Sequence, residues 1–214
     1  MKNSSSPKPG TKTLRARLRE ETEQTLLEAA EQLFAEQGVG GTRIEDIAKR
    51  AGVAVGTLYN YFEDREELLA ALLARRRAEL VKMLDEVSQE ARGKPWHEEF
   101  DAFLRATLTF LEQHRRFLSI LIQGEMTAPR HTSTAEETVG SGLDDIHACA
   151  ERLVRRGVAE GVLKPEFAAL YPALLLGMLR SAIVHDRYTD SPGPLLALLE
   201  PFRDFFLKGA GKKR

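Results

Sequence analysis

Residues 42–69 read TRIEDIAKRAGVAVGTLYNYFEDREELL, and this stretch decides the fold. Apolar residues recur at helical spacing on both sides of Gly52, which predicts two short helices joined by a tight glycine turn. Asp64 and the glutamates after it predict the start of a longer helix that reaches about residue 91. Two short helices around such a turn are typical of a helix-turn-helix, which places its second helix in the major groove of DNA.

The sequence before this turn predicts a bracing helix over residues 20–37, with an apolar stripe and a glycine at its end. Thr42 is a good N-cap residue for the helix that follows. Glu45 stands three residues after Thr42, so the two residues predict a capping box.

The helix after the turn has two unlike faces. Val55, Leu58 and Phe62 fall on one face at about 100° per residue, which predicts that this face is packed in the core. Threonine and asparagine can reach base edges and tyrosine can reach a phosphate, so the other face suits a DNA groove. That uncharged face carries Gly56, Thr57, Tyr59 and Asn60.

These residues resemble the DNA-binding domain of the tetracycline-repressor (TetR) family of bacterial transcriptional regulators. The resemblance covers about residues 20–75. It implies an all-α fold, with an N-terminal three-helix helix-turn-helix domain and a C-terminal helical bundle that binds an effector and dimerises. The matching segments are AAEQLFAEQG (29–38), Thr42 with Ile47 and Ala48, GVAVGTLYNYF (52–62) and EDREEL (63–68).

The resemblance also implies which residues meet DNA. Thr42 and Arg43 open the helix with which members of the family touch the sugar-phosphate backbone. Arg65 stands where many members carry a phosphate-binding lysine. Tyr61 could equally contact DNA or pack in the core, since its direction lies only about 60° from that of Leu58. The positions that meet the groove or its phosphate walls are Val55, Gly56, Thr57, Tyr59, Asn60 and Tyr61.

The net charge is −1, so the location of the basic residues matters more than their sum. Residues 1–19 contain no acidic residue and are rich in Ser, Pro and Gly, which predicts a disordered basic arm. This arm could lie along DNA phosphates or in the minor groove, or serve only as a solubilising tail. We expect a helix-turn-helix domain at 20–66, an effector-binding and dimerisation domain at 67–209, and a frayed tail at 210–214.

Composition narrows the class of protein. About 43% of the residues are apolar, which is enough for a core, and no stretch approaches the ~18 uninterrupted apolar residues of a membrane span. The N-terminus has no hydrophobic segment, so we expect no secretory signal. The single cysteine excludes an internal disulfide and fits a reducing cytoplasm, where we expect the protein to be located.

The C-terminal two thirds are predicted to be helical, with a polar loop at 127–141. The last two helices carry more apolar surface than one bundle face needs, which indicates either a dimer interface or deep core helices. The resemblance places the family's dimer contact there, and a two-fold dimer implies a palindromic operator. The candidate interface residues are Leu174, Met178, Ala182, Leu195, Leu198, Leu199, Phe202 and Phe206. The helices are predicted at 96–114, 115–125, 142–160 and 165–187, with a last one ending near Lys208.

The bundle interior is rich in aromatic and thioether side chains, which suit a hydrophobic or amphipathic small molecule. The alternative is that these side chains are ordinary core. From the resemblance we expect such a ligand to favour a splayed form whose recognition helices no longer match the operator. The candidate effector-binding residues are Trp96, Phe100, Phe103, Phe110, Phe117, Leu121, Met126, His147 and Met178.

Enzymatic interpretations lack their motifs. None of the five histidines is paired with another His or Cys at metal-ligand spacing, and there is no Walker loop, GxSxG or GxGxxG. We therefore expect no catalytic residue, metal or cofactor. We interpret the chain as a homodimeric transcriptional repressor that binds double-stranded DNA and is released from it by a small molecule. The alternatives are a DNA-binding dimer whose bundle recruits a protein partner without a ligand, and a helical enzyme or carrier.

Overall fold

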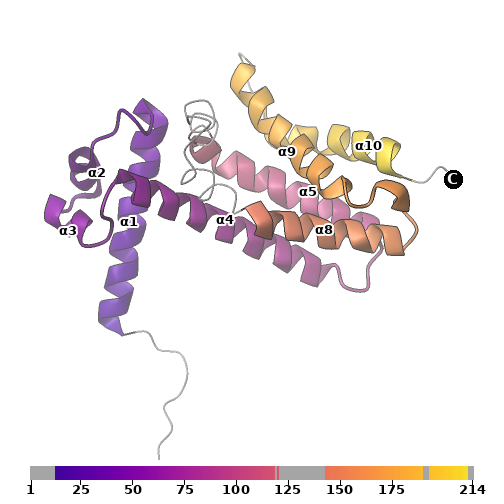
Figure 1. Cartoon of the computed structure of the whole chain (residues 1–214), viewed down its shortest axis with the longest axis horizontal. Helices are drawn as coiled ribbons and strands as arrows, with labels where there is room; N and C mark the ends of the chain where they lie inside the picture. Colours follow the sequence, from indigo (N-terminus) through magenta and orange to yellow (C-terminus); the bar gives the residue numbers. More distant parts are fainter. Residues whose placement is uncertain (1–12, 119, 121–142, 190–192, 212–214) are drawn as a thin grey trace, which may run out of the picture. The chain divides into compact units, whose positions relative to one another are not determined.

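The computed structural model describes residues 13–118, 120, 143–189 and 193–211 (Figure 1). Over these ranges the chain is helical and forms no β-strand, apart from an isolated bridge between Leu163 and Gly211. The chain divides into two compact units, Met1–Leu68 and Leu69–Arg214. The predicted all-α class is confirmed. Within the described ranges, no helix is both long and apolar enough to cross a membrane.

The first unit contains α1 (Leu14–Gln37), α2 (Ile44–Ala51), α3 (Val55–Tyr59) and the start of α4 (Arg65–Glu90). Its core joins the inner faces of these helices through side chains that are almost fully buried. A bidentate pair between Arg50 of α2 and Glu36 of α1, at 3.0 and 3.2 Å, fastens the two helices together at the surface. The central core side chains are Leu26, Ala30, Phe34, Ile47 and Leu58.

Helix α1 starts six residues earlier than the sequence predicted. Thr13 is its N-cap, and the Thr13 hydroxyl oxygen accepts a hydrogen bond from the amide of Ala16 at 3.3 Å. The prediction of a disordered arm is therefore wrong for residues 14–19, while residues 1–12 lie outside the described residues. The physical reason is that residues 14–19 are all leucine, arginine or alanine, which are strong helix formers, so the segment after Thr13 extends the helix.

The second unit is a helical bundle in which α5 (Trp96–Gln113) is central. Helix α5 packs against α8 (Leu143–Ala159), α9 (Tyr171–Tyr188) and α10 (Leu199–Ala210), as well as the short turn η2 (Leu195–Leu198) (Figure 1). Two predicted helices begin differently: the run from 165 opens as a 3-10 turn, η1 (Pro165–Phe167), and η2 precedes α10. The predicted loop at 127–141 lies outside the described residues.

An aromatic stack holds the core of the second unit. The ring of Trp96 stacks on Phe100 with centroids 4.8 Å apart, and Phe100 in turn stacks on Phe206 at 5.2 Å. The indole N–H of Trp96 donates to the Leu153 carbonyl at 2.8 Å, so its polar group is satisfied. Gly157 allows this close approach, because a Cβ there would lie 2.7 Å from the indole ring.

Candidate nucleic-acid interface

The turn between α2 and α3 is built by Gly52, whose φ of 72° and ψ of 26° are left-handed. Its amide donates to the carbonyl of Lys49 at 3.2 Å, and the amide of Val53 donates to that of Ala48 at 3.0 Å. These two bonds make a Schellman ending, which stops α2 and redirects the chain. Leu58, with no exposed area, then anchors α3 in the core. The direction of α3 is therefore fixed by the turn before it and by the packing of Leu58.

The start of α2 differs from the prediction. Arg43 is its N-cap, with no side-chain hydrogen bond, while the Thr42 hydroxyl donates to the carbonyl of Gly38 at 2.8 Å. The predicted capping box with Glu45 is therefore wrong. The Thr42 side chain is only 3% exposed, so its assignment as a DNA contact is also wrong, because its hydroxyl is used to close the end of α1. Arg43 is exposed and keeps its predicted place at the surface.

Helix α3 presents the uncharged surface that the sequence predicted. Tyr59 is 49% exposed, and Gly56 and Asn60 are also exposed, whereas Thr57 is half-buried. The prediction that Val55 packs in the core with Leu58 and Phe62 is wrong, because Val55 is 36% exposed. The Tyr59 hydroxyl and the side-chain amide of Asn60 have no hydrogen-bond partner in the part of the chain that the structure describes. This surface can therefore accept partners from outside the protein.

Tyr61 lies just beyond α3 and is half-buried, so it is neither fully packed nor fully free. The guanidinium carbon of Arg19 lies 5.6 Å from the centroid of the Tyr61 ring, within cation–π range. Sequence reasoning placed Arg19 in an arm and missed this contact. The signal that could have found it was the helix propensity of residues 14–19, which carries α1 past Tyr61.

Arg65, at the start of α4, is partly engaged within the protein. Its guanidinium donates to the Gly40 carbonyl at 3.1 Å and to Glu66 at 2.9 Å. The predicted cap of α4 is confirmed, because the Asp64 carboxylate accepts a hydrogen bond from the amide of Glu67 at 2.7 Å. The Arg65 side chain is 30% exposed, so its charge still faces solvent beside the carboxylate of Glu66.

Most of the predicted effector-binding residues are packed in the core of the second unit. Trp96 and Phe100 stack on other rings, and their assignment to an effector pocket stays a prediction. The described candidates with less than 5% exposure are Trp96, Phe100, Phe103, Phe110 and Phe117. His147 is exposed and Met178 is half-buried. Leu121 and Met126 lie outside the described residues.

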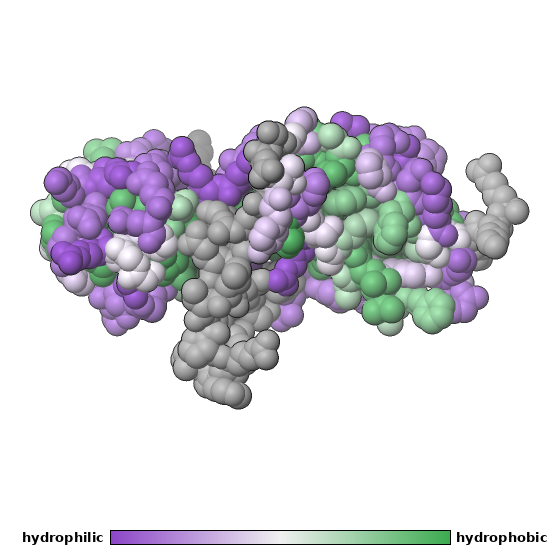
Figure 2. Space-filling view, turned by 90° about the horizontal axis from the view of Figure 1, so that it is seen from above, coloured by the Kyte–Doolittle hydropathy of each residue, from purple (hydrophilic) through white to green (hydrophobic). Residues whose placement is uncertain are grey.

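The predicted dimer residues divide by burial. Leu174 is 51% exposed, and Met178, Leu198 and Phe202 are half-buried. The assignment is wrong for four others, which are at most 7% exposed in the single chain and so belong to its own core: Ala182, Leu195, Leu199 and Phe206. Apolar surface is nonetheless displayed on the face formed by α9 and α10, as Figure 2 shows. Exposed apolar residues on or beside these helices are Leu170, Leu174, Val184, Tyr188, Leu196 and Phe205.

Comparisons with known proteins agree with this geometry. Residues 26–72 match the model for "Bacterial regulatory proteins, tetR family". The chain is 34% identical over 102 residues to the uncharacterized HTH-type transcriptional regulator TtgW of Pseudomonas putida, covering 48% of this chain and 73% of that protein. Several other curated relatives are matched over 36 to 48% of their length.

Solved structures share the fold of most of the chain. The fatty acid degradation regulator FadR from Bacillus halodurans superposes with a TM-score of 0.77 and 22% identity, covering 88% of this chain and 95% of that one. FadR from Bacillus subtilis, in complex with stearoyl-CoA, gives 0.74 and 19%, covering 87% and 98%. With its helix-turn-helix built as described above, the chain belongs to the TetR family of bacterial transcriptional regulators.

Proposed function

We propose that the protein is a homodimeric repressor that binds a palindromic operator and is released by a hydrophobic or amphipathic small molecule. The observation that carries this proposal is the exposed, uncharged face of α3, where the polar side-chain groups of Tyr59 and Asn60 have no hydrogen-bond partner among the described residues. A solvent-facing helix is normally charged, whereas amide and phenol groups on a rigid helix can read base edges and phosphates.

Dimerisation is supported by the apolar surface on α9 and α10. Leu174 and Phe205 are 51% and 77% exposed, which is unfavourable for large apolar side chains unless a partner covers them. One helix-turn-helix contacts too few base pairs for useful affinity, and a two-fold pair of them reads two half-sites about one helical turn apart. A palindromic operator follows from that symmetry.

Release by a small molecule is supported by the relative from Bacillus subtilis, which was solved with stearoyl-CoA. In this chain, an effector would act by binding one conformation of the dimer more tightly and so shifting the population away from the DNA-binding form. The size of the release is limited by that difference in affinity.

Selection of bound sequences from random duplex DNA tests the proposal. The full-length protein is expected to enrich a palindrome, and Asn60→Ala or Tyr59→Ala is expected to relax or abolish the enrichment. Gln89→Ala, which removes an exposed amide from α4 in the second unit, is the matched control and should enrich the same palindrome. Absence of enrichment at low salt, where phosphate contacts are strongest, would overturn the proposal.

Once the operator is known, measurements of operator affinity can distinguish release by a small-molecule ligand from a bundle that recruits a protein partner. A hydrophobic or amphipathic compound that lowers operator affinity supports the effector. Operator binding that no such compound changes would favour a bundle that only dimerises or recruits a protein.

A further inference from the structure

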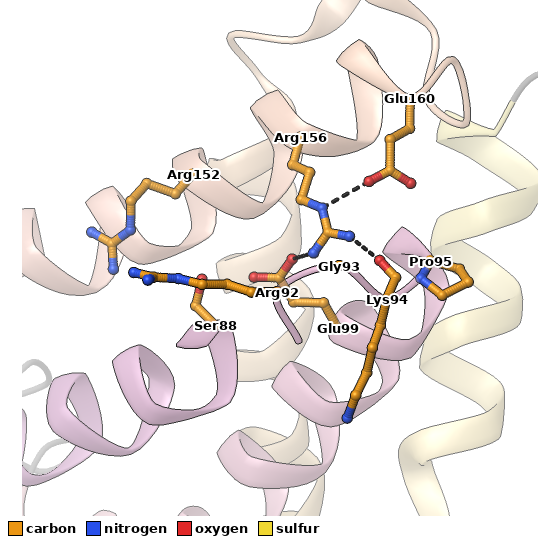
Figure 3. A pocket seen from close by; sticks show the side chains of 9 residues that line it. All are labelled: Ser88, Arg92, Gly93, Lys94, Pro95, Glu99, Arg152, Arg156 and Glu160. Atoms are coloured by element: carbon orange, nitrogen blue, oxygen red, sulfur yellow. Dashed lines mark hydrogen bonds and ion pairs between the residues drawn. The ribbon is translucent and has the colours of Figure 1, made fainter. Parts of the chain in front are cut away.

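A polar hollow of about 680 Å³ opens in the second unit where the end of α4, the turn into α5 and helix α8 meet (Figure 3). It is unlike the apolar core beside it, because four of its nine lining residues are basic and two are acidic. The lining residues are Ser88, Arg92, Gly93, Lys94, Pro95, Glu99, Arg152, Arg156 and Glu160.

Arg156 binds both carboxylates that line the hollow. Its guanidinium donates to Glu160 at 2.7 Å and to the buried Glu99 at 2.5 Å. It also donates to the carbonyls of Ala91 and Lys94, which end α4 and form the turn. One side chain thus supplies hydrogen bonds to both carboxylates and to the carbonyls at the helix end.

The two other arginines of the hollow differ: Arg152 is ion-paired with Asp85, whereas Arg92 has no side-chain partner among the described residues. Arg152 is held along one edge, where its Nη2 donates to Asp85 and lies 3.2 Å from the sulfur of Cys149. Its other nitrogens, Nε and Nη1, have no partner among the residues that the structure describes, and the same holds for the whole Arg92 side chain. Asp85 therefore orients Arg152 but leaves the N–H groups of Nε and Nη1 available to donate to a ligand.

Figure 3 shows that the guanidinium ends of Arg92 and Arg152 point toward one another across the hollow, with Ser88 beside them. Two like charges that converge repel each other, and this repulsion is relieved when an anion lies between them. The Ser88 hydroxyl also has no hydrogen-bond partner within the described ranges, so it is a further donor for such an anion.

We propose that Arg92, Arg152 and Ser88 bind the phosphoryl group of a phosphorylated small molecule. Arginine presents a planar fork of N–H donors that matches phosphate oxygens, and two forks from different elements can hold one group from two sides. The volume of about 680 Å³ exceeds that of a phosphate ion and lies in the range of small-molecule sites, so the hollow leaves room for the rest of a phosphorylated molecule. This site does not depend on DNA binding.

Titration calorimetry of the full-length protein with inorganic pyrophosphate at low salt tests the site. Loss of a charge-assisted hydrogen-bonding partner is expected to weaken binding about tenfold or more, so Kd should rise by that factor in Arg92→Gln and in Arg152→Gln. The control is Arg155→Gln, which removes one positive charge from the same helix. Arg155 is paired with Glu151 at 2.8 Å and does not line the hollow, so its Kd should stay within about twofold of the wild type.

Arg92→Gln carries the test by itself if Arg152→Gln disturbs folding, because Arg92 is exposed in a turn and supports no other described side chain. Circular dichroism checks that each variant is folded. The site is overturned if the wild type binds no pyrophosphate, if Arg92→Gln binds it as well as the wild type, or if Arg155→Gln loses as much affinity as Arg92→Gln. The last result would mean that only the net charge matters.

Discussion

Arg19 of α1 lies over the ring of Tyr61, with its guanidinium carbon 5.6 Å from the ring centroid. The contact joins the first turns of α1 to the residue that follows the recognition helix by two positions. It places a positive charge beside the uncharged surface of α3, where DNA phosphates would lie. A cation held by a ring loses less side-chain entropy on binding a phosphate than one on a free arm.

We therefore expect Arg19→Ala to weaken binding to operator and non-operator DNA alike, and to reduce the slope of log K against log salt by about 1. Fluorescence anisotropy over a salt series measures both quantities. Arg17→Ala is the matched control, since Arg17 is an exposed arginine of the same helix about 200° away from Arg19. An equal change in both variants would show that only the overall charge of α1 contributes.

Two glycines of the helix-turn-helix differ in what a side chain would do there: Gly52 lies in the turn and Gly56 lies in α3. At Gly52 the φ of 72° is unfavourable for any residue with a Cβ, although a Cβ there would meet no atom within 4 Å. Gly52→Ala is thus expected to lower the free energy of unfolding by about 1–2 kcal/mol through the backbone alone. Chemical denaturation measures this change.

Gly56 also leaves room for a Cβ but has no left-handed backbone, so Gly56→Ala should fold with no loss of stability. Because Gly56 is exposed on α3, the added methyl group is expected to lower DNA affinity. Comparing unfolding and DNA binding of the two variants separates the fold from the interface. A Gly56→Ala protein with unchanged operator affinity would place Gly56 outside the contact.

The helix-turn-helix could be predicted because its signals are local. Apolar spacing, a glycine at the turn and Asp64 at the cap all act within one or two helical turns, and the structure confirms this architecture. Thr42 shows where local reasoning fails. Its hydroxyl could cap α2 or donate to the carbonyl of Gly38, and the choice depends on the path of residues 38–42 in three dimensions.

From the sequence, the second unit could be predicted to have an apolar interior. Which of its side chains pack against one another could not be predicted. Trp96 and Phe100 lie four residues apart on one helix, so their contact follows from helical spacing, but only the fold brings Phe206 onto Phe100. Periodicity gives the direction of a side chain and not what it meets. The hollow around Arg92 was missed for the same reason, since α8 brings Arg152 to it from about sixty residues away.

Tight packing against the single tryptophan gives a further prediction. A Cβ on Gly157 would lie 2.7 Å from the Trp96 ring and 2.9 Å from Leu163, so Gly157→Ala should destabilise the protein by about 1–3 kcal/mol. The shift and intensity of tryptophan fluorescence during unfolding report on this one ring. Gly177→Ala, on α9, meets nothing within 4 Å and should be neutral or stabilising. Equal stability of both variants would contradict the close packing.

The proposed dimer predicts that Leu174→Glu shifts the protein to monomer, because a charge would be buried against the partner. Sedimentation velocity at several concentrations measures the change. Leu18→Glu makes the same substitution at a residue of α1 that is 54% exposed, and it should leave the oligomeric state unchanged. A Leu174→Glu protein that sediments like the wild type would move the interface elsewhere.

Glu112 ties the end of α5 to the start of η2 and predicts a pH dependence of stability. Its carboxylate accepts hydrogen bonds from the amide of Leu195 at 2.6 Å and from Arg115 at 3.1 Å. Burial alone would raise the pKa of Glu112, but the hydrogen bonds from Arg115 and Leu195 hold it below its usual value of 4.5. A carboxyl whose pKa is lowered by folding stabilises the protein fully above the unfolded pKa and less as pH falls through the folded one.

Glu112→Gln is therefore expected to lower the free energy of unfolding by about 1 kcal/mol at pH 7, or about 2–4 °C in Tm. The difference from the wild type should shrink as pH falls below about 4.5, because the wild-type carboxyl then loses its charge as well. Glu151→Gln, which removes an exposed carboxylate paired only within α8, should change stability by less than about 0.5 kcal/mol at any pH. Thermal melts of the three proteins from pH 3 to pH 7 decide the point: a Glu112→Gln difference that is constant over this range would mean that packing, and not the charge, ties η2 to α5.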